Sequence, residues 1–260
     1  MNQNLIKLIV CMVVLSLLIP ATCMGEEIVL KLGTQAQASS DWIGYLDRVN
    51  TRLGELSGGT MRIEIALGGQ LGSNAEHWAQ MNAGTLDLFA QGCDAPSVAP
   101  GGKDFDIVNL PFLFDDVDHW HRFLKSDIFA EMNAKFSEKT DVVYVGHLAD
   151  IAPRALTTGK VPVYKVSDIK GLVIRVPGSA LQTQVWADFG ANPTQSSVAE
   201  LMEGLQTGRY DGQDNGLGVI NEGFFDYQKY YMELDHTYQG VSVYASGKTW
   251  NKLSAEQQGW

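Results

Sequence analysis

The segment 171–179, Gly-Leu-Val-Ile-Arg-Val-Pro-Gly-Ser, constrains the fold more than any other part of the sequence. Its apolar, mostly β-branched residues predict a strand inside a covered sheet, and Pro177-Gly178-Ser179 predicts a turn into a helix that begins near Ala180. Arg175 lies within this apolar run. In an open α/β sheet, the turn between a strand and the following helix opens into the ligand crevice.

Arg175 needs an anionic partner if the strand is buried. A guanidinium keeps its charge in a protein, and burying it without a partner is costly. The partner is either a carboxylate from elsewhere in the chain or an anion that arrives from solution. The alternative is an edge strand whose Arg175 points into water or pairs with a surface Asp.

The rest of the chain alternates between strand and helix patterns. Apolar and alternating segments predict strands at 28–33, 61–65, 86–90, 141–146, 154–158, 172–176 and 240–244, and the polar segment 211–215 closes the second unit. Helical spacing and capping residues predict helices from Ser40 to the glycines at 58–59, at 73–82, after Asp115, after Ser126, at 180–189 and at 197–207. This order predicts an α/β fold with mostly parallel sheets and flanking helices.

The alternation is interrupted near Asp150, which predicts two lobes. Residues 26–150 form lobe I with the first half of a site, residues 151–239 form lobe II, and residues 240–260 return to lobe I. Capping-box spacing at Ser254 predicts a helix that is just beginning where the sequence stops. We therefore expect a chain that is C-terminally truncated.

Residues 1–25 have the pattern of a secretory signal peptide. One lysine precedes an apolar run from Leu8 to Ile19, which is short for a membrane span, and small residues follow it. Cys23 raises the alternative of a lipid anchor, but Pro20 stands where lipidation signals carry Leu. Removing the segment leaves Cys93 without another cysteine to pair with. We expect a protein that is exported to the periplasm.

The charge and the absence of motifs argue against several functions. A net charge of −11 at pH 7 without a basic cluster argues against nucleic acid as a partner. No nucleophile elbow, zinc-protease motif or phosphate-binding loop occurs, so no catalytic residue and no cofactor is predicted. His119 and His121 would face different sides of a helix, so no metal is predicted. Asp115, Asp116 and Asp118 are explained by the dipole at a helix start.

Three polar residues stand at strand ends of the second lobe. Arg154 begins one strand, Arg175 ends another, and Asn215 ends a third segment. If these segments are neighbours, two guanidiniums and one amide converge, an arrangement that suits a small organic anion. For Arg154 a surface role, and for Asn215 a turn role, are the alternatives.

At these residues the chain resembles the solute-binding receptors of tripartite ATP-independent periplasmic (TRAP) transporters. The resemblance runs from Leu30 to the end. Its most specific parts are Gly69-Gln70-Leu71-Gly72, Leu110-Pro111-Phe112, and the segments 170–177, 205–207 and 211–215. It implies a type II-like, two-lobed periplasmic binding protein that binds a small organic anion, either a carboxylate or a sulfonate, and delivers it to a sodium-driven membrane transporter.

The resemblance also implies roles for individual residues. It makes Arg175 the partner of the ligand carboxylate, with Arg154 and Asn215 as further contacts from lobe II. In lobe I, Gln35, Asn74 and the segment 91–94 stand where family members contact the rest of the ligand.

Two positions depart from the family pattern and leave the ligand unidentified. Ala152-Pro153 precede Arg154 where family members often have Gly-x, and Val198 stands where an aromatic residue often covers the ligand.

The partners implied are the TRAP membrane subunits, small and large or fused, and the receptor is expected to be a monomer. A sensor or chemoreceptor module with the same fold, and a periplasmic enzyme acting on an organic acid, are the alternatives.

Overall fold

The computed structural model of the protein describes residues 27–220 and 223–260. The predicted signal peptide, including Cys23, lies outside these residues. The strands are β1 (Ile28–Gly33), β2 (Met61–Ala66), β3 (Leu88–Gly92), β4 (Val142–Ile151), β5 (Arg154–Thr158), β6 (Val173–Val176), β7 (Asn192–Gln195), β8 (Gly212–Gly216), β9 (Tyr230–Met232) and β10 (Gln239–Ser246). The α-helices are α2 (Ile43–Leu56), α3 (Asn74–Ala83), α4 (Val117–Leu124), α5 (Asp127–Thr140), α6 (Ala180–Asp188), α7 (Val198–Gln206), α8 (Leu217–Ile220), α9 (Gly247–Trp250) and α10 (Ala255–Gly259). The 3-10 helices are η1 (Ala95–Val98), η2 (Lys103–Asn109), η3 (Val166–Ile169) and η4 (Phe224–Asp226).

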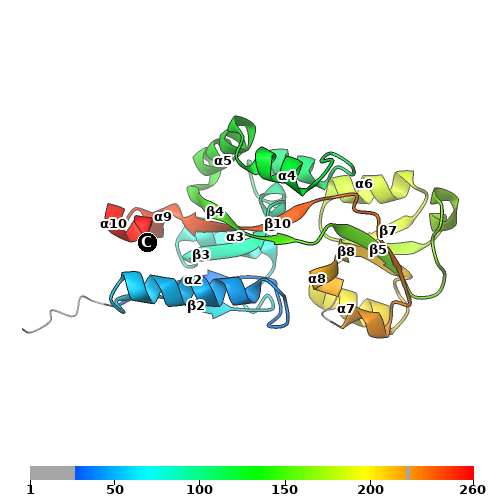
Figure 1. Ribbon diagram of the computed structural model, residues 1–260, viewed down its shortest axis with the longest axis horizontal. Helices are drawn as coiled ribbons and strands as arrows, with labels where there is room; N and C mark the ends of the chain where they lie inside the picture. The colour runs from blue at the N-terminus through cyan, green and yellow to red at the C-terminus, as the bar shows by residue number, and fades with distance from the viewer. Residues whose placement is uncertain (1–26, 221–222) are drawn as a thin grey trace, which may run out of the picture.

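The strands form two sheets that lie side by side along the long axis of the molecule (Figure 1). One sheet has the order β2-β1-β3-β10-β4 and the other β7-β6-β8-β5-β9. Residues 152–153 connect β4 to β5, and residues 233–238 connect β9 to β10. We call the first sheet with its helices lobe I and the second lobe II. The predicted two-lobed α/β fold is confirmed.

Each sheet is mixed, which corrects the expectation of mostly parallel sheets. Strand β1 pairs in parallel with β2 and β3, and β6 pairs in parallel with β7 and β8. Strand β10 pairs antiparallel with β3 and β4, and β5 pairs antiparallel with β8 and β9. The reason is the double connection between the lobes. Because β4 leaves lobe I where β10 enters it, these neighbours run in opposite directions.

Helices cover both faces of the lobe I sheet. Helix α2 buries Ile43, Leu46 and Leu53 on one face, since these residues recur on one side of a helix. On the other face Trp78 of α3 meets Phe136 of α5 edge to face, with ring centroids 5.2 Å apart. Burial on both faces leaves the strand ends and their loops as the places where a site can form.

The lobe II sheet is also covered on both faces. Helix α7 packs Leu201 against one face, and helix α6 packs Trp186 against Ile174 and Val176 on the other. Successive residues of a strand point to opposite faces, so Arg175 points away from α6. In the described part of the chain, no helix is both long enough and apolar enough to cross a membrane.

Candidate functional site

A cleft of about 450 Å³ lies between the two lobes. Its lobe I wall comes from the segments after β1 and β3 and from the start of α3, and its lobe II wall comes from the ends of β6, β7 and β8 and the start of α7. This is the edge of an α/β sheet at which ligand crevices form. All five residues predicted for the site line the cleft: Arg154, Arg175, Asn215, Gln35 and Asn74.

Arg175 is buried in the interior of the lobe II sheet. Strand β6 lies between β7 and β8, so the alternative of an edge strand is wrong. The Arg175 side chain borders the cleft, yet only 2% of the residue is exposed. Its Nε and Nη2 both donate hydrogen bonds to the carbonyl oxygen of Ser196, and the Nε bond is 3.0 Å long. These bonds hold the guanidinium in one place.

The charge of Arg175 is only partly compensated within the protein. Among the described residues no carboxylate lies within ion-pair distance of its guanidinium. Burial, together with the charge of Arg154, lowers the pKa of Arg175 to about 10, and the opposing charge of Asp214 offsets only part of these effects. The group is still cationic at neutral pH. A carboxylate in the cleft would supply the missing counter-charge through charge-assisted hydrogen bonds.

Ser196 is a site residue that the sequence reasoning missed. It lines the cleft beside Arg175, and its Oγ is buried without a hydrogen-bond partner among the described residues. Strand β7, which ends at the preceding residue Gln195, has the sequence Asn-Pro-Thr-Gln and lacks the apolar pattern that identifies a buried strand. The polar run before the predicted helix at 197–207 was the available signal.

Arg154 is tied to lobe II by an internal ion pair. Its Nε lies 2.8 Å from Asp214 Oδ1, its Nη2 donates to the Asp214 carbonyl, and its Nη1 donates to Gln239 Oε1 at 2.9 Å. Asp214 also accepts a bond from Trp186 Nε1 at 2.9 Å. Each nitrogen of Arg154 uses one hydrogen in these bonds, so the second hydrogens of Nη1 and Nη2 remain for a ligand.

The ion pair is stabilised in its charged form. Burial alone would raise the pKa of Asp214, but Arg154 and His236 outweigh burial and hold that pKa well below its usual range. The side chain of Asp214 is 2% exposed and that of Arg154 is 5% exposed. The pair therefore holds the Arg154 side chain in place beside the cleft.

Asn215 presents an amide to the cleft from β8. Its Nδ2 donates to Gln213 Oε1 at 2.6 Å, and Gln213 Nε2 donates to Thr157 Oγ1 at 2.8 Å. Asn215 pairs with Ala155 of β5 in the sheet, so it is a strand residue and the turn alternative is wrong. The bond to Gln213 uses the Asn215 side-chain nitrogen, so the side-chain oxygen Oδ1 of Asn215 remains to accept a hydrogen bond from a ligand.

The lobe I wall is built from amides and one half-buried carboxyl group. Gln35 Nε2 donates to Gly72 O at 2.6 Å, and Asn74 Oδ1 accepts from Gln91 Nε2 at 3.3 Å. Asp94 is half-buried, and burial raises its pKa although Arg154 acts in the opposite direction. This wall offers donors and acceptors in alternation, which suits hydroxyl groups of a ligand.

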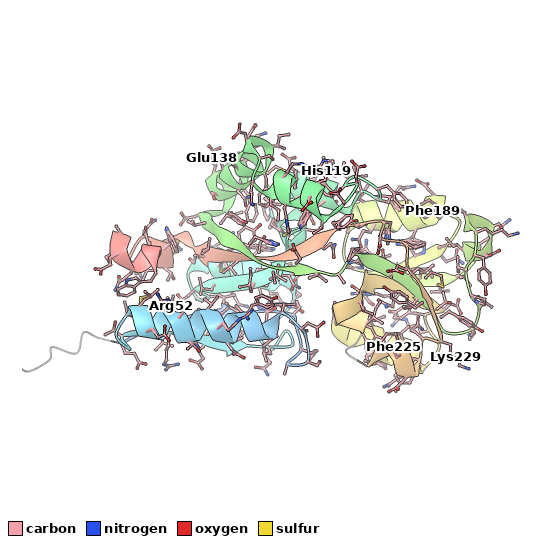
Figure 2. All side chains as sticks on the ribbon, viewed as in Figure 1. Arg52, His119, Glu138, Phe189, Phe225 and Lys229 are labelled. Carbon is pink, nitrogen blue, oxygen red and sulfur yellow. The ribbon has the colours of Figure 1, made fainter. Side chains whose placement is uncertain are left out.

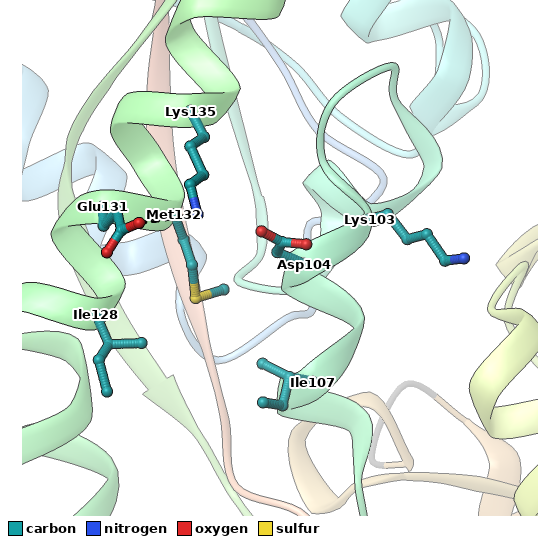
Figure 3. A pocket seen from close by; sticks show the side chains of 7 residues that line it. All are labelled: Lys103, Asp104, Ile107, Ile128, Glu131, Met132 and Lys135. Carbon is teal, nitrogen blue, oxygen red and sulfur yellow. Dashed lines mark ion pairs between the residues drawn. The ribbon is translucent and has the colours of Figure 1, made fainter.

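A second cavity of about 600 Å³ lies between η2 and α5, on lobe I (Figure 3). Its lining combines apolar and charged side chains: Lys103, Asp104, Ile107, Ile128, Glu131, Met132 and Lys135. Lys135 Nζ and Glu131 Oε1 pair at 2.8 Å, and both side chains are more than half exposed. These two charges are solvated and compensate each other, so the cleft between the lobes is the stronger candidate site.

Comparison with known proteins identifies a family model and several relatives that match this chain. The family model for bacterial extracellular solute-binding proteins of family 7 (DctP) matches residues 32–260. A solute-binding protein of Roseobacter denitrificans is 27% identical over 239 residues, covering 92% of this chain and 72% of that protein. The sialic acid-binding periplasmic protein SiaP of Vibrio cholerae is 30% identical over 241 residues, covering 90% of this chain and 72% of the relative.

A solved structure of similar fold is a TRAP periplasmic solute-binding protein from Pseudomonas putida F1 with bound D-glucuronate. The TM-score is 0.81 at 28% sequence identity, and the match covers 89% of this chain and 75% of the other. The chain thus spans about three quarters of the length of these proteins.

Proposed function

The chain belongs to the family 7 bacterial extracellular solute-binding proteins, and from this premise we propose that it holds a small organic anion between its lobes and delivers it to a TRAP membrane transporter. The resemblance stated from the sequence is confirmed by the family match. At the level of the family, a receptor for organic acids is confirmed as well. The relatives named above are binding proteins, which agrees with the prediction that the chain is not an enzyme.

One observation carries the proposal for the site. Arg175 is a buried cation at the cleft, and the hydrogen bonds that fix it go to a neutral carbonyl oxygen. A buried charge without a full counter-charge is unfavourable, and an arriving carboxylate removes that deficit. Arg175 therefore anchors the acid group, with Ser196 Oγ beside it, while Arg154 and Asn215 contribute further hydrogen bonds from lobe II.

The rest of the ligand carries hydroxyl groups. Gln35 and Asn74, with Gln91 and Asp94, form a wall of amides and a carboxyl group opposite lobe II. The relatives named for sialic acid and bound to D-glucuronate take acids of this kind, since both molecules combine one carboxylate with several hydroxyls. Sugar acids are accordingly the first ligands to test, and sulfonates with hydroxyl groups are the second.

The test is calorimetry with D-glucuronate and related sugar acids on the wild-type chain and on variants of Arg175. Removing one partner of a buried pair costs about 3–5 kcal/mol, so Arg175→Ala should weaken binding by roughly two to three and a half decades. Arg175→Lys should also bind poorly, because an ammonium cannot reproduce the planar fork. Near-normal affinity in both variants would refute the role.

Arg209→Ala is the matched control for this experiment. It removes the same charge from the same lobe, but Arg209 is exposed and does not line the cleft. Its affinity for the sugar acid should equal that of the wild type. A similar loss in Arg209→Ala and Arg175→Ala would mean that long-range charge, not the site geometry, attracts the anion.

The partners and the location follow from the family. We propose that the receptor works in the periplasm as a monomer and is recognised in its closed, ligand-bound form by the TRAP membrane subunits. A ligand that contacts both walls of the cleft binds the closed arrangement better and so shifts the population toward it. Small-angle scattering with and without a sugar acid tests the closure, and an unchanged radius of gyration at saturation would contradict it.

A further inference from the structure

Two histidines and one aspartate meet at the end of lobe I that faces lobe II. His121 is on α4, and His147 and Asp150 are on β4. His121 Nε2 lies 2.7 Å from Asp150 Oδ2, and His147 Nε2 lies 2.9 Å from Asp150 Oδ1. The ligand atoms of the three residues all lie within 4.8 Å of one another. We propose that this cluster is a binding site for a divalent transition-metal ion of the zinc type.

The donor set fits such an ion. Two imidazole nitrogens and one carboxylate oxygen are typical of zinc sites that keep one position open for water. Ligands at about 2.0–2.2 Å around a tetrahedral ion are about 3.3 Å apart. The two His–Asp150 distances of 2.7 and 2.9 Å therefore need to widen slightly, and longer separations, which reach at most 4.8 Å, need to shorten. The side chains of His121 and Asp150 are each 39% exposed and that of His147 is 23% exposed, so an ion can enter from solvent.

The surroundings orient the same atoms. Trp120 Nε1 donates to Asp150 Oδ1 at 3.3 Å, and His147 Nδ1 lies 3.9 Å from the thiol of Cys93. The Nδ1 side of His147 is thus directed into the protein, and its Nε2 is left for the ion. A side chain at Gly240 would place its Cβ 2.2 Å from the His147 ring, so glycine at this position makes room for the imidazole.

The charge of Asp150 is available for a cation. Among the described residues its ion pairs are with the two histidines, and no Lys or Arg pairs with it. None of the three residues lines the cleft between the lobes, so the proposed metal site is separate from the proposed solute site.

The position of the cluster gives the ion a structural role. Asp150 pairs with Gly240 in the sheet, and the next residues along β4 lead through 152–153 into lobe II. An ion held by His121 and Asp150 would fasten α4 to β4 beside both connections between the lobes.

The test is a titration of the full chain with Zn²⁺ by calorimetry, followed by Co²⁺ and its visible absorption as a probe of a tetrahedral nitrogen and oxygen site. We expect the wild type to bind one ion that His121→Gln and Asp150→Asn bind more than about tenfold more weakly, since even outer-shell changes cost about that much. Circular dichroism checks that both variants are folded.

His119→Gln is the matched control, and Figure 2 shows where His119 lies on α4. It stands two residues from His121 on the same helix, is 38% exposed, and contacts Asp115 instead of the cluster. It should bind the ion like the wild type. The proposal is overturned if the wild type binds no Zn²⁺, or if His121→Gln binds the same number of ions with the same affinity. Neither result bears on the solute site, because no solute is present.

Discussion

Two arginines of lobe II carry the same charge in different surroundings. Arg154 has an internal carboxylate at 2.8 Å, whereas Arg175 has only a backbone carbonyl. The first charge is therefore compensated within the folded structure, and the second has no internal carboxylate partner among the described residues. Replacing the partner of Arg154 should affect mainly stability, and replacing Arg175 should affect mainly binding.

Asp214→Asn tests the structural role of the ion pair. The change leaves Arg154 buried without its counter-charge, which typically costs about 3–5 kcal/mol. We expect the free energy of unfolding, measured by urea titration, to fall by that amount. Asp226→Asn, which alters an exposed carboxylate of the same lobe, is the control and should change stability by less than about 0.5 kcal/mol. Equal effects in the two variants would contradict a special role for the pair.

The same pair predicts a pH dependence. Burial alone would raise the pKa of Asp214, but Arg154 and His236 lower it in the folded state. A lowered carboxyl pKa stabilises the fold fully above the unfolded value of about 3.9, and this contribution is lost as the pH falls through the folded value. The difference in unfolding free energy between wild type and Asp214→Asn should therefore be constant near neutrality and shrink below about pH 4. A difference that grows on acidification would contradict it.

At the residue scale, the sequence predicted some of the residues that line the cleft, but it missed other contacts for physical reasons. Arg175 was predictable because a charge inside an apolar strand is unusual whatever the fold. The pairing of Arg154 with Asp214 was not, because it depends on the antiparallel register of β5 and β8, which joins residues far apart in the chain. His147 was missed for the same reason, since it meets His121 only after β4 packs beside α4.

At the element scale, a glycine inside a helix either lowers the stability of that helix or is needed to leave room for a neighbouring side chain. Gly204 lies in α7, and a Cβ at this position would be 2.1 Å from the ring of Tyr210, which is 2% exposed. Gly54 lies in α2, and a Cβ there would meet nothing within 4 Å. Helix propensity favours alanine at both positions by up to about 1 kcal/mol, but overpacking a core costs typically 1–3 kcal/mol.

Gly204→Ala and Gly54→Ala should therefore shift stability in opposite directions. We expect Gly204→Ala to lower the melting temperature, because a buried tyrosine ring cannot move aside freely. Gly54→Ala should raise it slightly, since the new methyl group meets no neighbour. Differential scanning calorimetry on the two variants measures both shifts. A stabilised Gly204→Ala would mean that Tyr210 has room to move.

Elements with strong apolar patterns were placed correctly from the sequence, and those without were not. The predicted helix at 180–189 is α6 (Ala180–Asp188), and the predicted strand at 154–158 is β5. Strands β7, β8 and β9 were not predicted as strands, because β7 and β8 have polar sequences and β9 is only three residues long. Their places are determined by the neighbouring strands β6 and β5, which supply the hydrogen bonds.

At the scale of the whole molecule, Asn109 joins the lobes through one buried amide. Its Oδ1 accepts bonds from Gln182 of α6 at 2.6 Å and from Gln239 of β10 at 3.2 Å. Its Nδ2 lies 3.4 Å from Asp94 Oδ2, at the cleft. Asn109 is 3% exposed, so solvent cannot easily replace these bonds. The side chain therefore connects lobe I, lobe II and the returning strand.

Asn109→Ala should lower the free energy of unfolding. It leaves the amides of Gln182 and Gln239 without this acceptor, and a buried unsatisfied group costs about 1–3 kcal/mol. Urea titration measures the loss. The control is Gln184→Ala on the same helix as Gln182, because Gln184 is exposed and bonds only locally, to Asp188 at 2.8 Å. A loss no larger than in the control would show that the amide does not couple the lobes.

The position of β10 in the lobe I sheet has a consequence for folding during translation. This strand lies between β3 and β4, and β4 has no other strand partner among the described residues. When a ribosome has synthesised the first 151 residues, four of the five strands of the lobe I sheet exist, but the one that joins β4 to the rest does not. Strand β4 can therefore join the lobe I sheet only after residues 239–246, and with them all the strands of lobe II, have been synthesised.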